Sequence, residues 1–203
     1  MIRKTHITVD GLAFSGKTTL ARLLARCLSL CSVSSGDAYR AIAAFILSEY
    51  ATADISGPKI ETTIARIHLE LCLVSTAERE YTFALNGNIY SAEELRSQAV
   101  DFVAAAIAQR DSVRKLVSES IRRFSQTNGV VLDGRDAGSQ ILPRADLKLV
   151  AEAPLSVRIA RRGSRLGQQS TTQDVYAAIV ARDILDLPRM SELYRKPEEY
   201  VLV

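Results

Sequence analysis

Short apolar runs alternate along the chain with longer segments in which apolar residues recur every three or four positions. The short runs are typical of buried strands, and the longer segments are typical of helices with one apolar face. We predict strands over THITV (5–9), LCSVS (30–34), VVLD (130–133), LKLVAEA (147–153) and YVLV (200–203). We predict helices over residues 17–28, 37–50, 57–67, 91–108, 111–126, 154–162 and 173–186. Because strands and helices alternate, we expect a mainly parallel five-stranded sheet with helices on both faces.

The pattern changes in the middle of the chain. LELCLVS (69–75) and EYTFALNGNIY (80–90) alternate apolar and polar residues, and Asn86-Gly87 is a strong signal for a tight hairpin turn. We therefore predict a small antiparallel sheet that is inserted into the α/β chain.

The charged residues nearly balance, with 26 Lys and Arg against 23 Asp and Glu and a net charge of +3. This excess is too small to indicate binding to nucleic acid or to an anionic membrane. MIRKTHITV enters its first strand without a signal-type apolar region, and no run approaches the length of a membrane span. Cys27, Cys31 and Cys72 lie in or beside apolar segments, without metal-ligand spacing. We expect buried free thiols in a cytoplasmic monomer with no nucleic-acid or membrane partner.

The segment VDGLAFSGKTTLARLLA contains Gly11, four further residues, and then Gly16, Lys17 and Thr18. Between a buried strand and an amphipathic helix, this spacing predicts a phosphate-binding loop, in a three-layer α/β/α fold. Lys17 is expected to reach the terminal phosphates, and the Thr18 hydroxyl is expected to bind Mg²⁺. The alternative is a plain strand-to-helix turn with a surface lysine. The residues expected to bind the phosphates of ATP are Gly11, Leu12, Ala13, Phe14, Ser15, Gly16, Lys17, Thr18 and Thr19.

Ligands of a parallel sheet collect at the carboxyl ends of its strands. SSGDAYR follows the second strand, LDGRDAG follows the third, and RIARRGSR belongs to the helix and loop after the fourth. Each segment supplies arginines or acids at the edge where the phosphate loop lies.

Taken in order, VDGLAFSGKTT, SSGDAYRA, LDGRDAG, RIARR and ARDILDLPR resemble the bacterial cytidylate kinases, from about Thr5 to Val203. The resemblance implies transfer of the γ-phosphoryl group of ATP to CMP or dCMP, with Mg²⁺. It also implies a core (1–36, 106–162 and 173–203), an insert that binds the nucleoside monophosphate (37–105) and a mobile lid (163–172).

The resemblance assigns the acceptor side of the site. Ser35 and Arg40 match contacts to the acceptor phosphate, and Arg135 matches a further contact to it. Asp136 matches a base contact, placed to accept a hydrogen bond from the cytosine amino group that uracil lacks. Asp133 is placed to orient Mg²⁺ through water or to brace the loop. The structural alternative for Ser35 and Arg40 is a helix N-cap and a solvated arginine.

Further along the chain, the resemblance assigns Arg182 and Asp186 to the sugar and Arg189 to a phosphate. Arg114 matches an arginine that recognises the base, although it also fits an ordinary charged helix face.

Three arginines flank the lid. Arg161 and Arg162 are expected to stabilise charge on the transferring phosphoryl group. Arg158, at helical spacing from them, is expected to lie on a solvated face.

The reaction demands little proton chemistry, because the acceptor is already a phosphate oxyanion. Catalysis is expected to consist of in-line positioning and neutralisation of charge. The residues expected to carry it are Lys17, Arg135, Arg161, Arg162 and Arg189.

Two residues depart from the family pattern. Phe14 stands where these kinases usually have glycine, and Ala105 stands where they have a serine that contacts the base. The chain also stops at Val203, where relatives add a helix, so it is either compact by lineage or truncated. These departures leave two alternatives open: a kinase for another small acceptor such as UMP, and a nucleotide-binding regulatory protein without transfer activity.

Two nucleotides must be held in line and then released, so we expect the insert and the lid to move. Without ligand, the site arginines are expected to repel one another. The expected unliganded form is open, with residues 163–172 poorly ordered.

Overall fold

The computed structural model describes residues 4–50, 58–75, 80–91, 94–166 and 171–203. Its central sheet contains five parallel strands in the order β2-β6-β1-β7-β8. Their bounds are β1 His6–Asp10, β2 Cys31–Ser34, β6 Val130–Gly134, β7 Leu147–Val150 and β8 Val201–Leu202. The predicted parallel sheet is confirmed, although β7 stops three residues earlier than expected.

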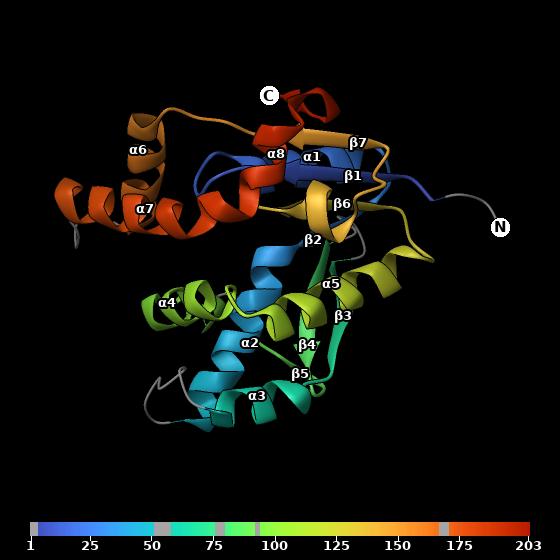
Figure 1. The fold of residues 1–203 in the computed structure, drawn as a ribbon, viewed down its shortest axis with the longest axis vertical. Coiled ribbons are helices and arrows are strands. Elements are labelled where there is room, and N and C mark those ends of the chain that lie inside the picture. The colour runs from blue at the N-terminus through green and yellow to red at the C-terminus, as the bar shows by residue number, and fades with distance from the viewer. Residues whose placement is uncertain (1–3, 51–57, 76–79, 92–93, 167–170) are drawn as a thin grey trace.

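The antiparallel strands β3 (Leu69–Ser75), β4 (Glu80–Leu85) and β5 (Asn88–Ile89) also form as predicted. Asn86 and Gly87 have φ values of 50° and 82°, the left-handed conformation that a tight hairpin turn needs. These strands extend the core sheet, because β4 pairs with β2 in parallel through Ser32 and Glu80. Figure 1 shows the core at one end of the long axis and α3 with the β4–β5 hairpin at the other.

Helices cover the sheet and build the rest of the insert. The longer helices are α1 Lys17–Cys27, α2 Ser35–Glu49, α3 Pro58–Ala65, α4 Gln98–Ile107, α5 Asp111–Ser125, α6 Leu155–Leu166 and α7 Thr172–Asp186. The shorter ones are α8 Ser191–Arg195, the single turns η1 Glu94–Arg96, η4 Leu187–Met190 and η5 Pro197–Glu199, and the π-helical turn η2 Ala137–Ile141.

Two helix boundaries differ from the predictions by more than two residues. The helix expected from residue 91 begins at Gln98, because the Ser97 hydroxyl caps it by accepting from the Val100 N–H at 3.3 Å. The loop expected from residue 163 is helical to Leu166, because glycine lowers the stability of a helix but does not end it. The rest of the predicted lid, residues 167–170, lies outside the described residues.

The sheet separates two apolar cores, and β6 contributes to both. Val130 and Leu132 point into the larger core beneath α2, α4 and α5, whereas Val131 points into the core beneath α1. This alternation is the two-residue period of a strand that is buried on both faces.

Of the three cysteines, Cys31 is buried, Cys72 is half-buried and Cys27 is exposed. The prediction of a buried thiol is therefore wrong for Cys27, which ends α1. Among the described helices, none is long and apolar enough to span a membrane.

A buried carboxylate ties the end of β1 to the turn after β6. Asp10, which is 1% exposed, accepts hydrogen bonds from the backbone N–H groups of Ala137 at 2.8 Å and Gly138 at 2.9 Å. Gly138 allows this approach, because a Cβ there would lie 2.7 Å from the Thr8 hydroxyl. Burial raises the pKa of Asp10 to about 6, although the two N–H groups oppose the rise.

This raised pKa predicts a pH dependence for the stability of the fold. In the unfolded chain the Asp10 carboxyl has its ordinary pKa of 3.8, so the folded state binds its proton more tightly. Its contribution should therefore favour folding as the pH falls from about 7 to about 4, by at most about 3 kcal/mol. Asp10→Asn removes this titration. Urea unfolding of both proteins across this range measures the difference, and a difference that is constant with pH would contradict the prediction.

Candidate functional site

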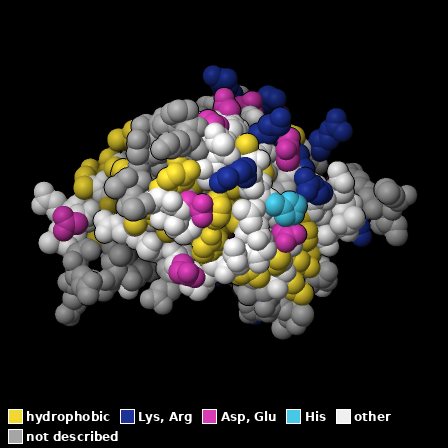
Figure 2. All heavy atoms as spheres, turned by 90° about the horizontal axis from the view of Figure 1, so that it is seen from below, with side chains coloured by type: hydrophobic (Ala, Val, Ile, Leu, Met, Phe, Trp, Pro, Cys, Tyr) yellow, Lys and Arg dark blue, Asp and Glu magenta, His cyan; other side chains and the backbone are white. Residues whose placement is uncertain are grey.

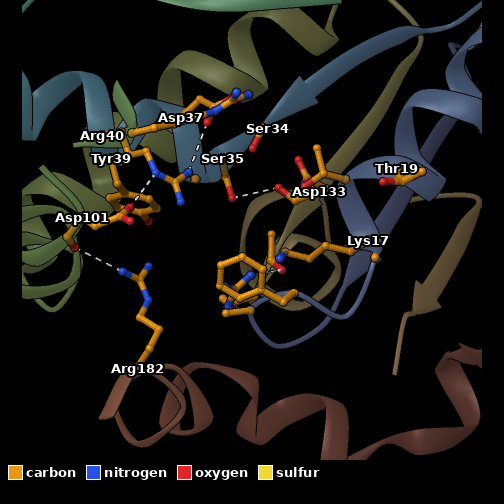
Figure 3. Close-up of a pocket in the computed structure, with 18 of the residues that line it drawn as sticks. Lys17, Thr19, Ser34, Ser35, Asp37, Tyr39, Arg40, Asp101, Asp133 and Arg182 are labelled. Atoms are coloured by element: carbon orange, nitrogen blue, oxygen red, sulfur yellow. Dashed lines mark hydrogen bonds and ion pairs between the residues drawn. The ribbon is translucent and has the colours of Figure 1, made fainter. Parts of the chain in front are cut away.

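A cavity of about 330 Å³ opens at the carboxyl ends of the core strands. Its walls come from the loop before α1, the start of α2, the turn after β6 and one face of α7. In Figure 3, Lys17 and Asp133 face the cavity from one side, Arg40 and Asp101 from another, and Arg182 from α7. The predicted residues that line it are Ala13, Phe14, Gly16, Lys17, Thr18, Thr19, Ser35, Arg40, Asp133, Arg135, Arg162, Arg182 and Arg189.

The other predicted residues lie around this lining. Gly11, Leu12 and Ser15 line a second, adjacent cavity behind the phosphate loop. Arg114, Asp136, Asp186 and Arg161 contact residues of the loop or of the main cavity wall.

The phosphate loop depends on three residues with positive φ. Gly11 has a φ of 153°, and a Cβ there would lie 2.4 Å from the Ala151 carbonyl oxygen. Gly16, with a φ of 104°, directly precedes α1. Phe14 has a φ of 62°, a left-handed conformation that is unfavourable for a residue with a large side chain. The loop thus keeps a backbone suited to glycine even where the sequence has phenylalanine.

Lys17 is the first residue of α1 and is 9% exposed. Its ammonium donates to the Leu12 carbonyl oxygen at 3.4 Å. Burial lowers the pKa of Lys17 to about 7, and the nearby charge of Arg135 lowers it further, while Asp133 opposes the shift. A polyphosphate bound at this loop would supply the missing negative charge.

Thr18 and Asp133 lie together beside the loop, with the threonine hydroxyl donating to the carboxylate at 2.5 Å. A hydroxyl and a carboxylate suit Mg²⁺, which binds through few protein groups, waters and nucleotide phosphates. Among the described residues, no group of three His, Cys, Asp or Glu side chains forms a closed metal site. These two residues fit a magnesium ion that arrives with a nucleotide.

On the opposite wall, α2 presents Ser35 and Arg40. The Ser35 hydroxyl donates to the Asp133 carbonyl oxygen at 3.0 Å, which joins the two walls. The Arg40 guanidinium donates to Asp101 at 3.0 Å and to Asp37 at 3.2 Å (Figure 3). Arg40 is therefore held in place by two carboxylates and is not simply solvated.

Asp136, which is 2% exposed, sits between two arginines. Arg114 approaches one of its oxygens at 2.8 Å, and Arg189 donates to the other at 2.9 Å. Arg189 also lies over the Tyr39 ring, 4.9 Å from its centre. Arg114 is therefore paired with a buried carboxylate and is not simply solvated.

Asp186, near the end of α7, pairs with Arg135 at 2.7 Å and with Arg182 at 3.1 Å. Burial opposes ionisation of Asp186, but the two arginines outweigh it and lower its pKa. Arg182 also donates to the Asp101 carbonyl oxygen at 3.4 Å, which links α7 to α4 (Figure 3).

The arginines of α6 contact the phosphate loop. Arg161 donates to the carbonyl oxygens of Phe14 at 3.0 Å and Ser15 at 2.7 Å. Arg158 is 6% exposed and pairs with Asp183 at 2.8 Å, so the prediction of a solvated Arg158 is wrong. The carboxylate of Asp183, on the neighbouring helix α7, balances the buried charge of Arg158.

Carboxylates offset the expected repulsion for part of the site, because Arg40 and Arg114 pair with aspartates, whereas Arg161 contacts backbone carbonyls. Sequence reasoning missed the arginine partners Asp37, Asp101 and Asp183, and it missed Asp10, which holds the turn after β6. Asp37 stands three residues before Arg40, a spacing that predicts a contact on one helix face. The partners from distant segments carry no such local signal.

Figure 2 views the molecule from the insert end. Lys and Arg side chains on this face are interspersed with Asp and Glu and do not form one basic surface.

Comparison with known proteins identifies the family. The family described as cytidylate kinase matches residues 7–203. The cytidylate kinase of Phocaeicola vulgatus is 28% identical over 207 residues, covering 100% of this chain and 90% of that protein. The cytidylate kinase of Acidiphilium cryptum is 35% identical over 192 residues, covering 93% and 82%. The cytidylate kinase of Carboxydothermus hydrogenoformans is 31% identical over 206 residues, covering 98% and 88%.

These matches confirm the family that the motifs of the sequence indicate. The chain belongs to the cytidylate kinase family.

Proposed function

We propose that this protein transfers the γ-phosphoryl group of ATP to CMP or dCMP, giving ADP and CDP or dCDP. One observation carries the proposal: two cationic sites face the same cavity. The phosphate loop with Lys17 forms one site, and Arg40, Arg135, Arg182 and Arg189 line the other. A protein that only binds one nucleotide has no need for the second.

The two sites hold the donor and the acceptor phosphates in line, so the acceptor oxyanion attacks without a general base. Lys17 and the arginines offset the charge that spreads over the transferring group. Thr18 and Asp133 would hold Mg²⁺, which, when bound, neutralises phosphate charge. Two further positive charges beside the loop come from Arg161 and Arg162 of α6.

The paired arginines are prepared for phosphate before it arrives. Asp37 and Asp101 hold Arg40, and Asp186 holds Arg135, so little side-chain freedom is lost when a phosphate binds. We assign to Asp186 the acceptance of a hydrogen bond from a sugar hydroxyl, and its partner Arg182 can donate one to a sugar oxygen.

Asp136 supports selection of cytosine. Its carboxylate, held by Arg114 and Arg189, can accept a hydrogen bond from the exocyclic amino group. Uracil presents a carbonyl oxygen there, which a carboxylate repels. Ala105, at 9% exposure on α4, offers no hydrogen bond to the base, so selection rests on Asp136.

We further propose that residues 37–105 act as the insert that binds the monophosphate and that residues 163–172 act as the lid. α2 begins at Ser35, which lines the cavity, and Figure 1 shows this helix running from the core sheet into the insert, which supports the first assignment. Arg161 and Arg162 contact the phosphate loop directly before residue 163, which supports a lid that continues from α6.

Lys17→Met tests the phosphate loop. The substitution removes the ammonium but keeps an unbranched side chain, so kcat/KM for ATP should fall at least about a hundred-fold. Because it also removes a buried charge, the thermal midpoint should not decrease. ADP release with CMP as acceptor gives the rate, and calorimetry gives the midpoint. Turnover close to that of the wild type would contradict the assigned role of the loop.

A panel of monophosphates tests base selection. We expect kcat/KM for CMP and dCMP to exceed that for UMP by on the order of a hundred-fold, because the Asp136 carboxylate meets an amino group in one base and a carbonyl in the other. The same ADP-release assay measures all three acceptors. Equal values for CMP and UMP would show that Asp136 does not select the base, and transfer only to another acceptor would replace the proposed substrate.

Binding of both nucleotides should close the site. A bisubstrate mimic that joins CMP to ATP should reduce the radius of gyration in solution scattering and slow hydrogen exchange in α6 and in residues 37–105. ATP alone serves as the comparison, because it engages the loop without the insert. A mimic that binds tightly but changes neither measurement would refute closure.

A further inference from the structure

Phe14 holds a strained backbone conformation at the phosphate loop. Among the described residues other than glycine, only Phe14, Ser29 and Asn86 have positive φ. Asn86 belongs to a hairpin turn, where asparagine readily adopts this conformation. A phenylalanine at 62° carries strain that glycine would relieve, and such strain at a functional loop indicates that the side chain has a use.

The ring of Phe14 contacts α6, the helix that leads into the proposed lid. The Arg162 guanidinium of α6 lies over the ring face, with its carbon 5.3 Å from the ring centre. Phe14 and Arg162 are both half-buried, and both line the main cavity. The Nε atom of Arg162 is buried without a hydrogen-bond partner in the described structure. The Arg162 guanidinium therefore contacts the Phe14 ring through its face, while its Nε–H has no acceptor.

This type of contact leaves Arg162 able to bind an anion. A guanidinium that stacks on an aromatic ring uses its face, whereas its N–H groups point outward in the plane. Arg162 is thus held at the wall of the phosphate site with donors still available. A carboxylate partner would occupy those donors.

The neighbouring arginine of α6 is held on the same loop in a different way. Arg161 donates to the backbone carbonyl oxygens of Phe14 and Ser15. A glycine at position 14 would keep these carbonyl contacts but would lose the ring. The side chain of Phe14 therefore adds the contact with Arg162.

We propose that Phe14 is a positioning residue for Arg162. Its ring holds the guanidinium at the phosphate loop before ATP binds, so Arg162 is already in place to contact the transferring phosphoryl group. This inference rests on the proposed kinase function. It assigns to the phosphate loop a part in placing the lid, in addition to binding the donor phosphates.

Four variants test the kinetic consequence. Phe14→Leu keeps a Cβ at the left-handed position but removes the ring face, so kcat should fall on the order of ten-fold while KM for CMP stays unchanged. Phe14→Tyr keeps the ring face, so its kcat should stay within about two-fold of that of the wild type. Phe14→Gly relieves the backbone strain, and it should be impaired as Phe14→Leu is. Phe102→Leu makes the same substitution at a residue that is 71% exposed on α4 and should change nothing.

Measurements without nucleotide separate this inference from the proposed function. Thermal unfolding of the wild type, Phe14→Leu, Arg162→Met and the double variant should be non-additive, because each single substitution removes the same contact. The Nε–H resonance of Arg162, assigned by its loss in Arg162→Lys, should lie upfield and move downfield in Phe14→Leu.

Additive unfolding midpoints with an unshifted resonance would overturn the inference even if CMP kinase activity is high. Coupling and a shifted resonance in a protein that phosphorylates neither CMP nor dCMP would overturn the proposed function alone.

A kinetic result can also overturn the inference. If Phe14→Gly is as active as the wild type while Phe14→Leu is impaired, the loop needs a relaxed backbone and not a ring. If the kcat of Phe14→Tyr falls as far as that of Phe14→Leu, the ring face is not what positions Arg162.

Discussion

The two hydrogen bonds to the Asp10 carboxylate fix the relation between the halves of the site. Asp10 ends the strand that leads into the phosphate loop, and its partners Ala137 and Gly138 open the turn that follows Asp136. Parallel pairing of β1 with β6 sets the two strands side by side, but pairing alone does not fix the loops that leave them. The carboxylate does so, because a buried charge held by two N–H groups tolerates little displacement. This contact therefore fixes the positions of Lys17, Arg135 and Asp136 relative to one another.

Within that frame, the cavity gathers several arginines, with carboxylates beside them. Asp186 and Asp136 each pair with two arginines, and Asp37 and Asp101 together hold Arg40. An anionic ligand can then share or replace existing partners, and the arginines need not be ordered anew. The same carboxylates make the ligand-free state tolerable, since a cluster of unpaired guanidinium groups in a buried space would be strongly destabilising.

The sequence predicted the parts of this structure that local patterns encode. Alternation and periodicity located every strand of the parallel sheet, and Gly11, Gly16 and Lys17 located the phosphate loop, because each signal lies within a few residues of the chain. Contacts between distant segments could not be found in this way. Arg40 and Asp101 are 61 positions apart, and Arg158 appeared to be one of several arginines on a helix face until α7 supplied Asp183. The extension of α6 past Gly163 has no strong signal either, since glycine there is compatible with a loop or a helix.

The course of α2 has a mechanical consequence. This helix of 15 residues begins at Ser35, whose hydroxyl is anchored on the core at Asp133, and ends inside the insert. At about 1.5 Å per residue it is a lever of about 22 Å, with Arg40 only about 8 Å from the pivot. A rotation of about 10° around Ser35 would carry the far end of α2 through about 4 Å but Arg40 through little more than about 1 Å. If the insert rotates as proposed, α2 would convert a wide movement of the insert into a small displacement of Arg40.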